Sequence, residues 1–193
     1  MTDKKLKSNL KDRTLSFVKK NLKTILIILI SLVVFLLIFL FYKNLQEKNN
    51  IKIAEKYNYA SILIIQKEKE EGKLLLESII NDNHNFYSPL ALYLLMEKYP
   101  KLDSLKIINF FNKILKNNSI SKENLNLIKL KKAIYLINFD REELIIQTLN
   151  PIINSDSVWR NLSINIIIEY FLAKDQIVKA DEYIKLLNNE TRN

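Results

Sequence analysis

The hydrophobic positions of the chain fall into two different patterns. The first is an uninterrupted run at residues 25–41, ILIILISLVVFLLIFLF, in which Ser31 is the only residue that is not Leu, Ile, Val or Phe. With Thr24 and Tyr42 the run makes nineteen residues, which as a helix span roughly 28 Å, close to the ~30 Å hydrocarbon core of a bilayer. The pattern predicts a transmembrane helix over residues 24–42.

The core helix of a soluble protein and a cleavable signal peptide also contain long apolar runs. A core helix normally keeps a polar stripe, whereas this run is apolar on all sides. The apolar region of a signal peptide is usually about 7 to 15 residues long and ends at small residues. This run is longer and is followed by Tyr42, Lys43 and Asn44. We therefore expect an anchor that stays attached to the chain.

The charges on the two sides of the anchor differ. Residues 1–23 contain eight Lys and Arg residues against Asp3 and Asp12, whereas residues 43–56 contain four Lys residues. Because cytoplasmic flanks of membrane helices are enriched in Lys and Arg, we expect the N-terminus in the cytoplasm and the C-terminal part across the membrane. The first part of the chain then divides into a basic cytoplasmic tail at 1–23, the membrane helix at 24–42 and a spacer at 43–52, which either extends the helix or separates it from the next domain.

From residue 53 onward the apolar residues recur at helical spacing between short polar segments. With one Gly and three Pro, the chain has few of the turn formers that an all-β fold requires. The pattern predicts an all-α domain over residues 53–193, in which Asp140 and Glu143 form a capping box before the sixth helix. The expected helices form four hairpins, over about 53–66 and 72–80, 87–98 and 104–116, 122–138 and 141–153, and 158–173 and 176–187.

The second helices of the four hairpins show a repeat, with aligned positions at Gly72, Ile107, Ile145 and Ala180. The spacings are 35, 38 and 35 residues, close to the 34-residue tetratricopeptide (TPR) period. Apolar residues coincide again four and seven positions later. On the first helices, small or apolar residues lie twelve positions before the aligned site in three hairpins, at Ala60, Ala133 and Ile168. The second hairpin departs from this pattern, because its small residue Ala91 lies sixteen positions before the aligned site. We predict a TPR-like α-solenoid of about four hairpins.

Charge and composition disfavour several classes of function. Of the formal net charge of +9, residues 1–23 carry +6, so the remaining +3 forms no concentrated patch for a nucleic acid. The chain has no Cys, one His and one Gly, which excludes thiolate nucleophiles, Cys-ligated zinc and Gly-rich phosphate loops. We expect no catalytic, cofactor-binding or metal-binding residues, no enzyme activity, no cofactor, and no nucleic-acid or small-molecule partner.

The arrangement as a whole resembles a known family. A short basic tail, one uncleaved anchor, a spacer and degenerate TPR-like hairpins are similar to the bacterial YfgM-like ancillary SecYEG translocon subunits. Besides the anchor, the resemblance is carried by AEKYNYASILIIQKEKEEGKLLLESII at 54–80, FYSPLALYLLMEK at 86–98 and AKDQIVKADEYIKLL at 173–187. It implies a bacterial inner-membrane protein whose periplasmic domain works beside the translocon and periplasmic chaperones on newly exported proteins.

An array of helical hairpins leaves a groove along its first helices, and the lack of reactive groups favours binding as its function. Amphipathic or long side chains able to hold an extended polypeptide occur on those helices at Tyr57, Tyr93, Lys132 and Tyr170. The expected partners are translocon subunits, a periplasmic chaperone or exported polypeptides, with the lipid bilayer around residues 24–42. One alternative is an anchored TPR scaffold for envelope or cell-division machinery. A hydrolase without a recognisable motif is another, which the missing nucleophile and metal motifs disfavour.

Overall fold

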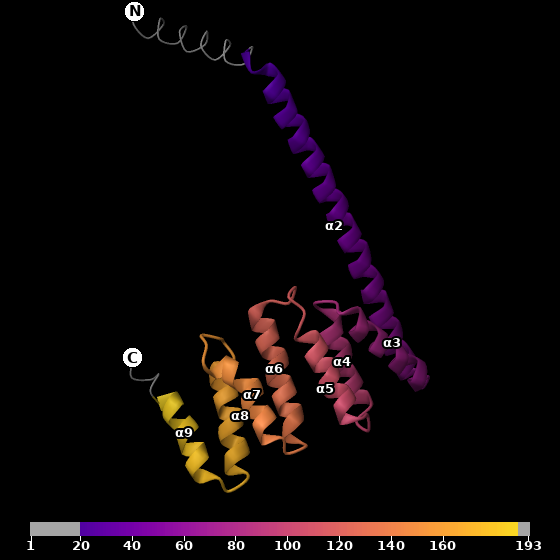
Figure 1. The fold of residues 1–193 in the computed structure, drawn as a ribbon. Coiled ribbons are helices and arrows are strands. Elements are labelled where there is room, and N and C mark those ends of the chain that lie inside the picture. The colour runs from indigo at the N-terminus through magenta and orange to yellow at the C-terminus, as the bar shows by residue number, and fades with distance from the viewer. Residues whose placement is uncertain (1–19, 189–193) are drawn as a thin grey trace, which may run out of the picture. The chain divides into compact units, whose positions relative to one another are not determined.

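The computed structural model describes residues 20–188, and all regular secondary structure within that range is α-helical. The predicted all-α class is therefore confirmed for this part of the chain. Most of the basic tail predicted at residues 1–23 lies outside the described residues. The eight helices labelled in Figure 1 are α2 Leu22–Ile65, α3 Lys69–Asp82, α4 Tyr87–Lys98, α5 Ser104–Ile114, α6 Lys122–Ile137, α7 Glu142–Ile153, α8 Arg160–Leu172 and α9 Ile177–Asn188.

Helix α2 is 44 residues long and belongs partly to each of the two compact units of the chain, Met1–Lys52 and Ile53–Asn193. The predicted spacer at 43–52 lies within this helix. Every side chain from Leu26 to Lys52 is exposed, and none of the most apolar eighteen-residue window is buried. Since the core helix of a soluble protein would be mostly buried, α2 is not a core helix in this region. By length and composition it can cross a membrane.

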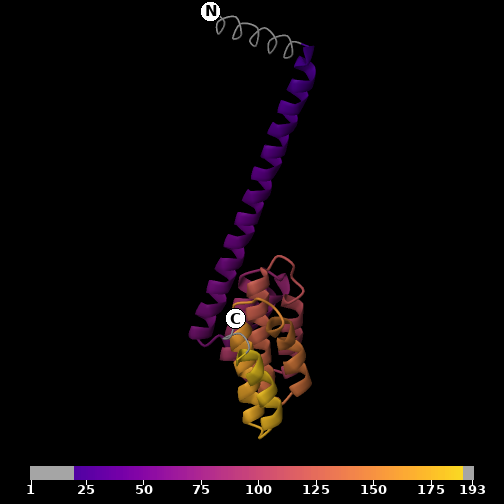
Figure 2. The same ribbon diagram turned by 90° about the vertical axis from the view of Figure 1, so that its left-hand side faces the viewer.

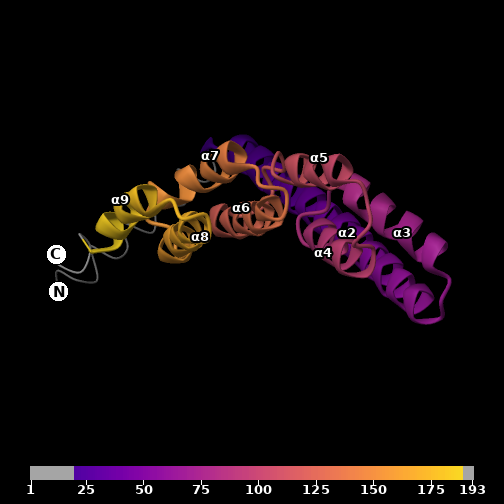
Figure 3. The same cartoon turned by 90° about the horizontal axis from the view of Figure 1, so that it is seen from below.

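The second unit contains the last turns of α2 and the helices α3 to α9, which form two rows. Figure 3 shows α3, α5, α7 and α9 along one row and α4, α6 and α8 along the other. From α3 onward, each helix packs against the next helix in the chain, and α3 with α5 and α6 with α8 are also in contact. Figure 2 shows α8 and α9 side by side as an antiparallel pair.

The apolar positions that align in the sequence form the core of this unit. In α3, α5 and α7 the residues at the aligned site and four and seven positions later are all buried. In α9 the aligned Ala180 is buried, whereas Ile184 and Leu187 are only half-buried, because no later helix among the described residues covers them. The predicted stripe is therefore confirmed, and its fully buried members are Gly72, Leu76, Ile79, Ile107, Phe111, Ile114, Ile145, Leu149 and Ile152.

The first hairpin is closely packed at the chain's single glycine. A Cβ atom at Gly72 would lie 2.7 Å from Cγ1 of Ile64 and 3.1 Å from the backbone oxygen of Ala60. Both distances are shorter than ordinary van der Waals contact. The small residues Gly72 on α3 and Ala60 on α2 therefore allow these two helices to approach each other, which is the role expected for the small positions of the repeat.

Polar contacts also join neighbouring hairpins. The side-chain amide of Asn117 donates a hydrogen bond of 2.6 Å to the backbone oxygen of Asn83, 34 residues away. The Ser157 hydroxyl donates one of 2.8 Å to the Glu123 carboxylate, also 34 residues away. The same Glu123 carboxylate accepts a bond from the backbone N–H of Val158. These bonds join the first hairpin to the second and the third hairpin to the fourth.

The capping box predicted at Asp140 and Glu143 is wrong. The N-cap of α7 is Arg141, which makes no side-chain capping bond, and Asp140 has a left-handed backbone conformation with a φ of 52°. Its carboxylate instead accepts hydrogen bonds from Tyr170 and Lys174 in the next hairpin. The prediction failed because it considered only the local helix start, whereas a tertiary neighbour supplies the partners of this carboxylate.

Candidate functional site

Two adjoining pockets lie on the row formed by α4, α6 and α8. The α4–α6 pocket has a volume of about 360 Å³ and is lined by Tyr93, Met96, Glu97, Lys131, Ile134, Tyr135 and Asn138. The α6–α8 pocket has a volume of about 650 Å³ and is lined by Ile134, Ile137, Asp140, Ile166, Glu169, Tyr170, Ala173 and Lys174. Ile134, which is 47 % exposed, lines both pockets. We refer to the two joined pockets as the groove.

Equivalent positions of successive hairpins build the groove. Residues 131, 134, 135 and 138 line the α4–α6 pocket, and residues 166, 169, 170 and 173, each 35 positions later, line the α6–α8 pocket. The buried positions Ile145 and Ala180 are separated by the same 35 residues. Because the stripes are buried in register, the exposed residues beside them come into register as well. The groove is therefore a consequence of the repeat.

Tyr93 contributes an aromatic surface to the α4–α6 pocket. The ammonium group of Lys131 lies 5.0 Å from the centroid of its ring, within the range of a cation–π interaction. The Tyr93 hydroxyl is buried and has no hydrogen-bond partner within the described part of the chain. Burial raises the pKa of Tyr93 to about 12, so the hydroxyl remains a protonated donor.

Asp140 organises the polar side of the α6–α8 pocket. Its carboxylate accepts a hydrogen bond of 2.6 Å from the Tyr170 hydroxyl and another from the Lys174 ammonium group. The bond from Lys174 is the main cause that lowers the pKa of Asp140, and it also raises the pKa of Lys174. Both groups are therefore charged at neutral pH and compensate each other. Glu169 is the other carboxylate that lines this pocket.

Two of the four candidate binding residues line the groove. Tyr93 on α4 is half-buried in the α4–α6 pocket, and Tyr170 on α8 lies in the α6–α8 pocket with 5 % of its surface exposed. The fold thus brings two tyrosines that are far apart in the sequence to one surface. Tyr93 offers more of its side chain to a bound molecule than Tyr170, whose main contact is the hydrogen bond to Asp140.

The other two candidates, Tyr57 and Lys132, are not among the residues that line either pocket. The Tyr57 ring packs against the core, with its centroid 5.7 Å from that of Tyr87. The Lys132 ammonium group donates a hydrogen bond of 2.8 Å to Asn112 in the other row of helices, and burial lowers the pKa of Lys132. Successive residues of a helix point about 100° apart, and it is Lys131 that lines the groove.

Lys131, Ile134 and Glu169 also line the groove and were not among the binding residues predicted from the sequence. The predicted residues were aromatic or long side chains, whereas these three are exposed positions of the repeat. The sequence contains a pattern that indicates two of these positions, because Ile134 directly follows the aligned Ala133 and Glu169 directly follows the aligned Ile168. The residue after each small or apolar first-helix position therefore marks the groove in these two hairpins.

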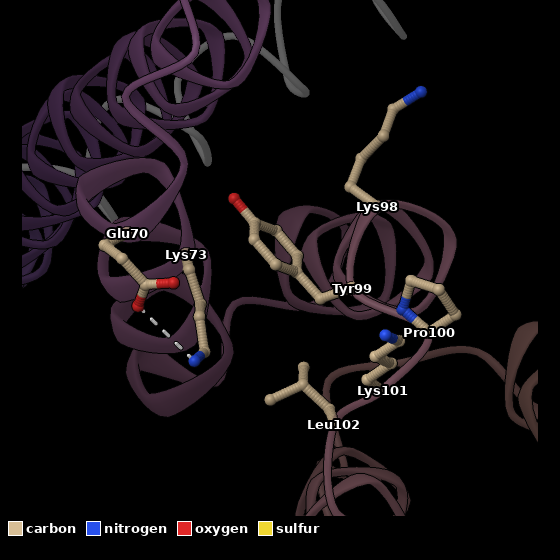
Figure 4. A pocket seen from close by; sticks show the side chains of 7 residues that line it. All are labelled: Glu70, Lys73, Lys98, Tyr99, Pro100, Lys101 and Leu102. Atoms are coloured by element: carbon tan, nitrogen blue, oxygen red, sulfur yellow. Dashed lines mark ion pairs between the residues drawn. The ribbon is translucent and has the colours of Figure 1, made fainter.

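A third pocket, of about 350 Å³, lies between the start of α3 and the loop after α4 and shares no residue with the groove (Figure 4). Lys73 pairs with Glu70 at 3.6 Å between nitrogen and oxygen, and in Figure 4 the Lys98 side chain points away from this pair. The lysines of this pocket therefore do not form one cationic site. Its lining residues are Glu70, Lys73, Lys98, Tyr99, Pro100, Lys101 and Leu102.

The groove offers apolar, aromatic and charged surfaces suited to binding. Within residues 20–188 no group of three His, Asp or Glu side chains is placed to hold a metal ion. Nδ1 of the single histidine, His84, accepts hydrogen bonds from the backbone N–H groups of Phe86 and Tyr87 at the start of α4, which is a structural role. Comparison of the chain with protein-family models, with curated proteins and with solved structures gives no match.

Proposed function

We propose that this protein is a membrane-anchored protein-interaction module, without enzymatic activity, that binds extended polypeptide segments in its groove. In this proposal α2 crosses the bacterial inner membrane through residues 24–42, the N-terminus is cytoplasmic, and the second unit is a TPR-like α-solenoid in the periplasm. Its partners are translocon subunits, a periplasmic chaperone or exported polypeptides, and its role is that of an ancillary translocon subunit.

The observation that supports the proposal is that the two adjoining pockets share the exposed Ile134 in their linings. A groove that extends over three neighbouring helices covers two interhelical spacings, roughly 16–20 Å. An extended chain of about five or six residues has that length. The exposed Ile134 and the neighbouring Met96 and Ile166 can contact aliphatic side chains without selecting one sequence, while the Tyr93 ring adds an aromatic surface. These features suit a polypeptide better than a compact small molecule.

The anchor supports the assignment to protein export. A helix that can cross a membrane restricts the domain to the membrane surface, and a polypeptide that leaves a translocon is extended and emerges at that surface. The excess of Lys and Arg in residues 1–23 over the segment after the anchor supports a domain on the outer side of the inner membrane.

Photo-crosslinking in living cells tests the proposal. The residue p-benzoylphenylalanine is introduced at Tyr93 or at Ile134 in the groove, and at Leu105 on α5 as the control. Leu105 is 62 % exposed and lies in the other row of helices. We expect the two groove positions to capture translocon subunits, a periplasmic chaperone or exported polypeptides, identified by mass spectrometry, with a yield that rises when a secreted protein is overproduced.

Two results would argue against the proposal. Equal yields of the same products at Leu105 and Ile134 would show that the groove is not the binding site. The crosslinked products could instead contain only cell-division or wall-synthesis proteins, with a yield that does not change with export load. This result would favour the scaffold alternative and contradict a role in protein export.

A further inference from the structure

Ion pairs within the domain compensate part of the charge that lines the groove. In the α4–α6 pocket, the Glu97 carboxylate accepts a hydrogen bond of 2.6 Å from the ammonium group of the neighbouring Lys98. In the α6–α8 pocket, the Asp140 carboxylate is held by Lys174 and Tyr170. These carboxylates already have cationic partners and are therefore weaker sites for a charge on a bound molecule.

Two charged groups of opposite sign remain, one in each pocket. Lys131 in the α4–α6 pocket is exposed and contacts the Tyr93 ring, and no carboxylate within residues 20–188 pairs with it. Glu169 in the α6–α8 pocket is also exposed, and no cation in the same range pairs with it. The exposed Ile134 lines both pockets. The groove therefore offers a positive site, an apolar middle and a negative site.

We infer that the groove selects extended polypeptide segments in which a short aliphatic stretch lies between one acidic and one basic side chain. The acidic side chain lies near Lys131, the aliphatic side chains contact Ile134, and the basic side chain lies near Glu169. This inference rests on the proposed function, because it concerns the same groove and names the class of polypeptide that occupies it.

Charge complementarity distinguishes this occupant from others. A nucleic acid would bring phosphate groups against Glu169, which no cation within residues 20–188 compensates, and like charges repel. A segment with two acidic ends would be attracted by Lys131 but repelled by Glu169. A segment with two basic ends would be attracted by Glu169 but repelled by Lys131. Only a segment with one charge of each sign satisfies both sites.

The test measures the affinity of full-length protein in nanodiscs for four fluorescent peptides by fluorescence anisotropy, with empty nanodiscs as the blank. The peptides share one aliphatic centre and have blocked termini. Their end residues are Asp and Lys, two Asp, two Lys, or two Ser. The variants are Lys131→Glu and Glu169→Lys, whose exposed positions should leave the melting temperature unchanged. The matched controls are Lys116→Glu and Glu182→Lys, at exposed residues that line neither pocket of the groove.

We expect the native groove to prefer the Asp/Lys peptide over the two-Asp and two-Lys peptides by roughly threefold or more, as is typical of exposed charge pairs. Lys131→Glu should move the preference to the two-Lys peptide, and Glu169→Lys should move it to the two-Asp peptide. Neither control should change the order. These preferences depend on peptide composition and not on the direction in which the peptide binds.

The outcomes separate the inference from the proposed function. If all four peptides bind equally to the native protein and to both groove variants, the groove does not discriminate peptides by charge. The inference is then wrong, while the proposed binding of polypeptides is still supported. If no peptide binds, including the uncharged two-Ser peptide, the proposed function fails and the inference fails with it.

Discussion

Along α2, every side chain from Leu26 to Lys52 is exposed, whereas Ala60, Leu63 and Ile64 a few turns later are at most 8 % exposed. The first region is apolar on all sides through residue 41, so no single neighbour could cover it, and by length and composition it can cross a membrane. The second region buries one face within its own unit. The comparison shows that the distribution of apolar residues around a helix, more than their number, decides whether one face of it can be buried against the domain.

The largest effect should come from a charge placed in the buried stripe. Leu76 on α3 is 0 % exposed, so Leu76→Asp should cost about 4 kcal/mol or more of the free energy of unfolding, a large part of the 5–15 kcal/mol typical of a domain. The measurement is circular dichroism with urea on fragment 49–193. We expect this fragment to be soluble and helical without the anchor, since its stripes are buried within its own unit.

Leu74, two residues earlier on the same helix, provides the matched control. It is 64 % exposed, and Leu74→Asp should change the free energy of unfolding by about 0.5 kcal/mol or less. A fragment that is mainly β-sheet, or that tolerates both substitutions equally, would contradict the packing of the stripe.

A charge in the exposed apolar region of α2 should act on membrane insertion alone. Val33→Asp should make insertion less favourable by about 3 kcal/mol and should leave the unfolding of the domain unchanged. Alkaline extraction of membranes measures the insertion, and Leu45→Asp, at an exposed position beyond residue 42, is the control. If alkaline extraction releases the same fraction of Val33→Asp, Leu45→Asp and the native chain, the prediction of a membrane helix is wrong.

A smaller effect is expected where the two helices of the first hairpin approach most closely. Gly72→Ala places a Cβ atom 2.7 Å from Cγ1 of Ile64. Overpacking destabilises a domain by about 1–3 kcal/mol, and the higher helix propensity of alanine stabilises it by about 1 kcal/mol. We therefore expect the free energy of unfolding, measured with urea, to fall by about 1 kcal/mol. Ile64→Ala should be less costly in the Gly72→Ala background than in the native one, because it removes the clashing atom. Additive effects of the two substitutions would refute the close approach.

The smallest effect concerns pH and His84. Burial lowers the pKa of His84 below its usual 6.5, so the folded domain favours the neutral ring that accepts hydrogen bonds at the start of α4. Stability should therefore fall as the pH drops through about 6.5, the unfolded pKa, and level off below the folded pKa. Asp140, Glu142 and Asp156 have lowered pKa values and stay ionised down to pH 5.5.

The readout is the melting temperature of fragment 49–193 at pH 7.5 and pH 5.5. It should drop by on the order of one degree for the native fragment. The drop should vanish in His84→Asn, whose side chain keeps an acceptor near the helix start but does not titrate. A drop of the same size in both proteins would assign the pH dependence to other groups.

The fold was more predictable than the groove. Helix positions follow from local periodicity, and residues 87–98 were predicted with the bounds that α4 has in the structure. The candidate residues were chosen by side-chain type, which led to Tyr93 and Tyr170 in the groove but also to Lys132, whose ammonium group binds Asn112 instead. Side-chain type indicates what a residue can bind, but the rotation of each helix about its axis decides which residues face the same space.

By itself, the sequence determined an apolar segment long enough to cross a bilayer, the all-α class and the buried stripes, because each depends on the order of residues within one helix or on their spacing between repeats. The tertiary structure decided that Lys131 rather than Lys132 lines the groove, that Ile134 joins its two pockets, and that Asp140 bonds to the next hairpin instead of capping α7. These features depend on how neighbouring helices are rotated and how closely they approach, which the periodicity of a single helix does not specify.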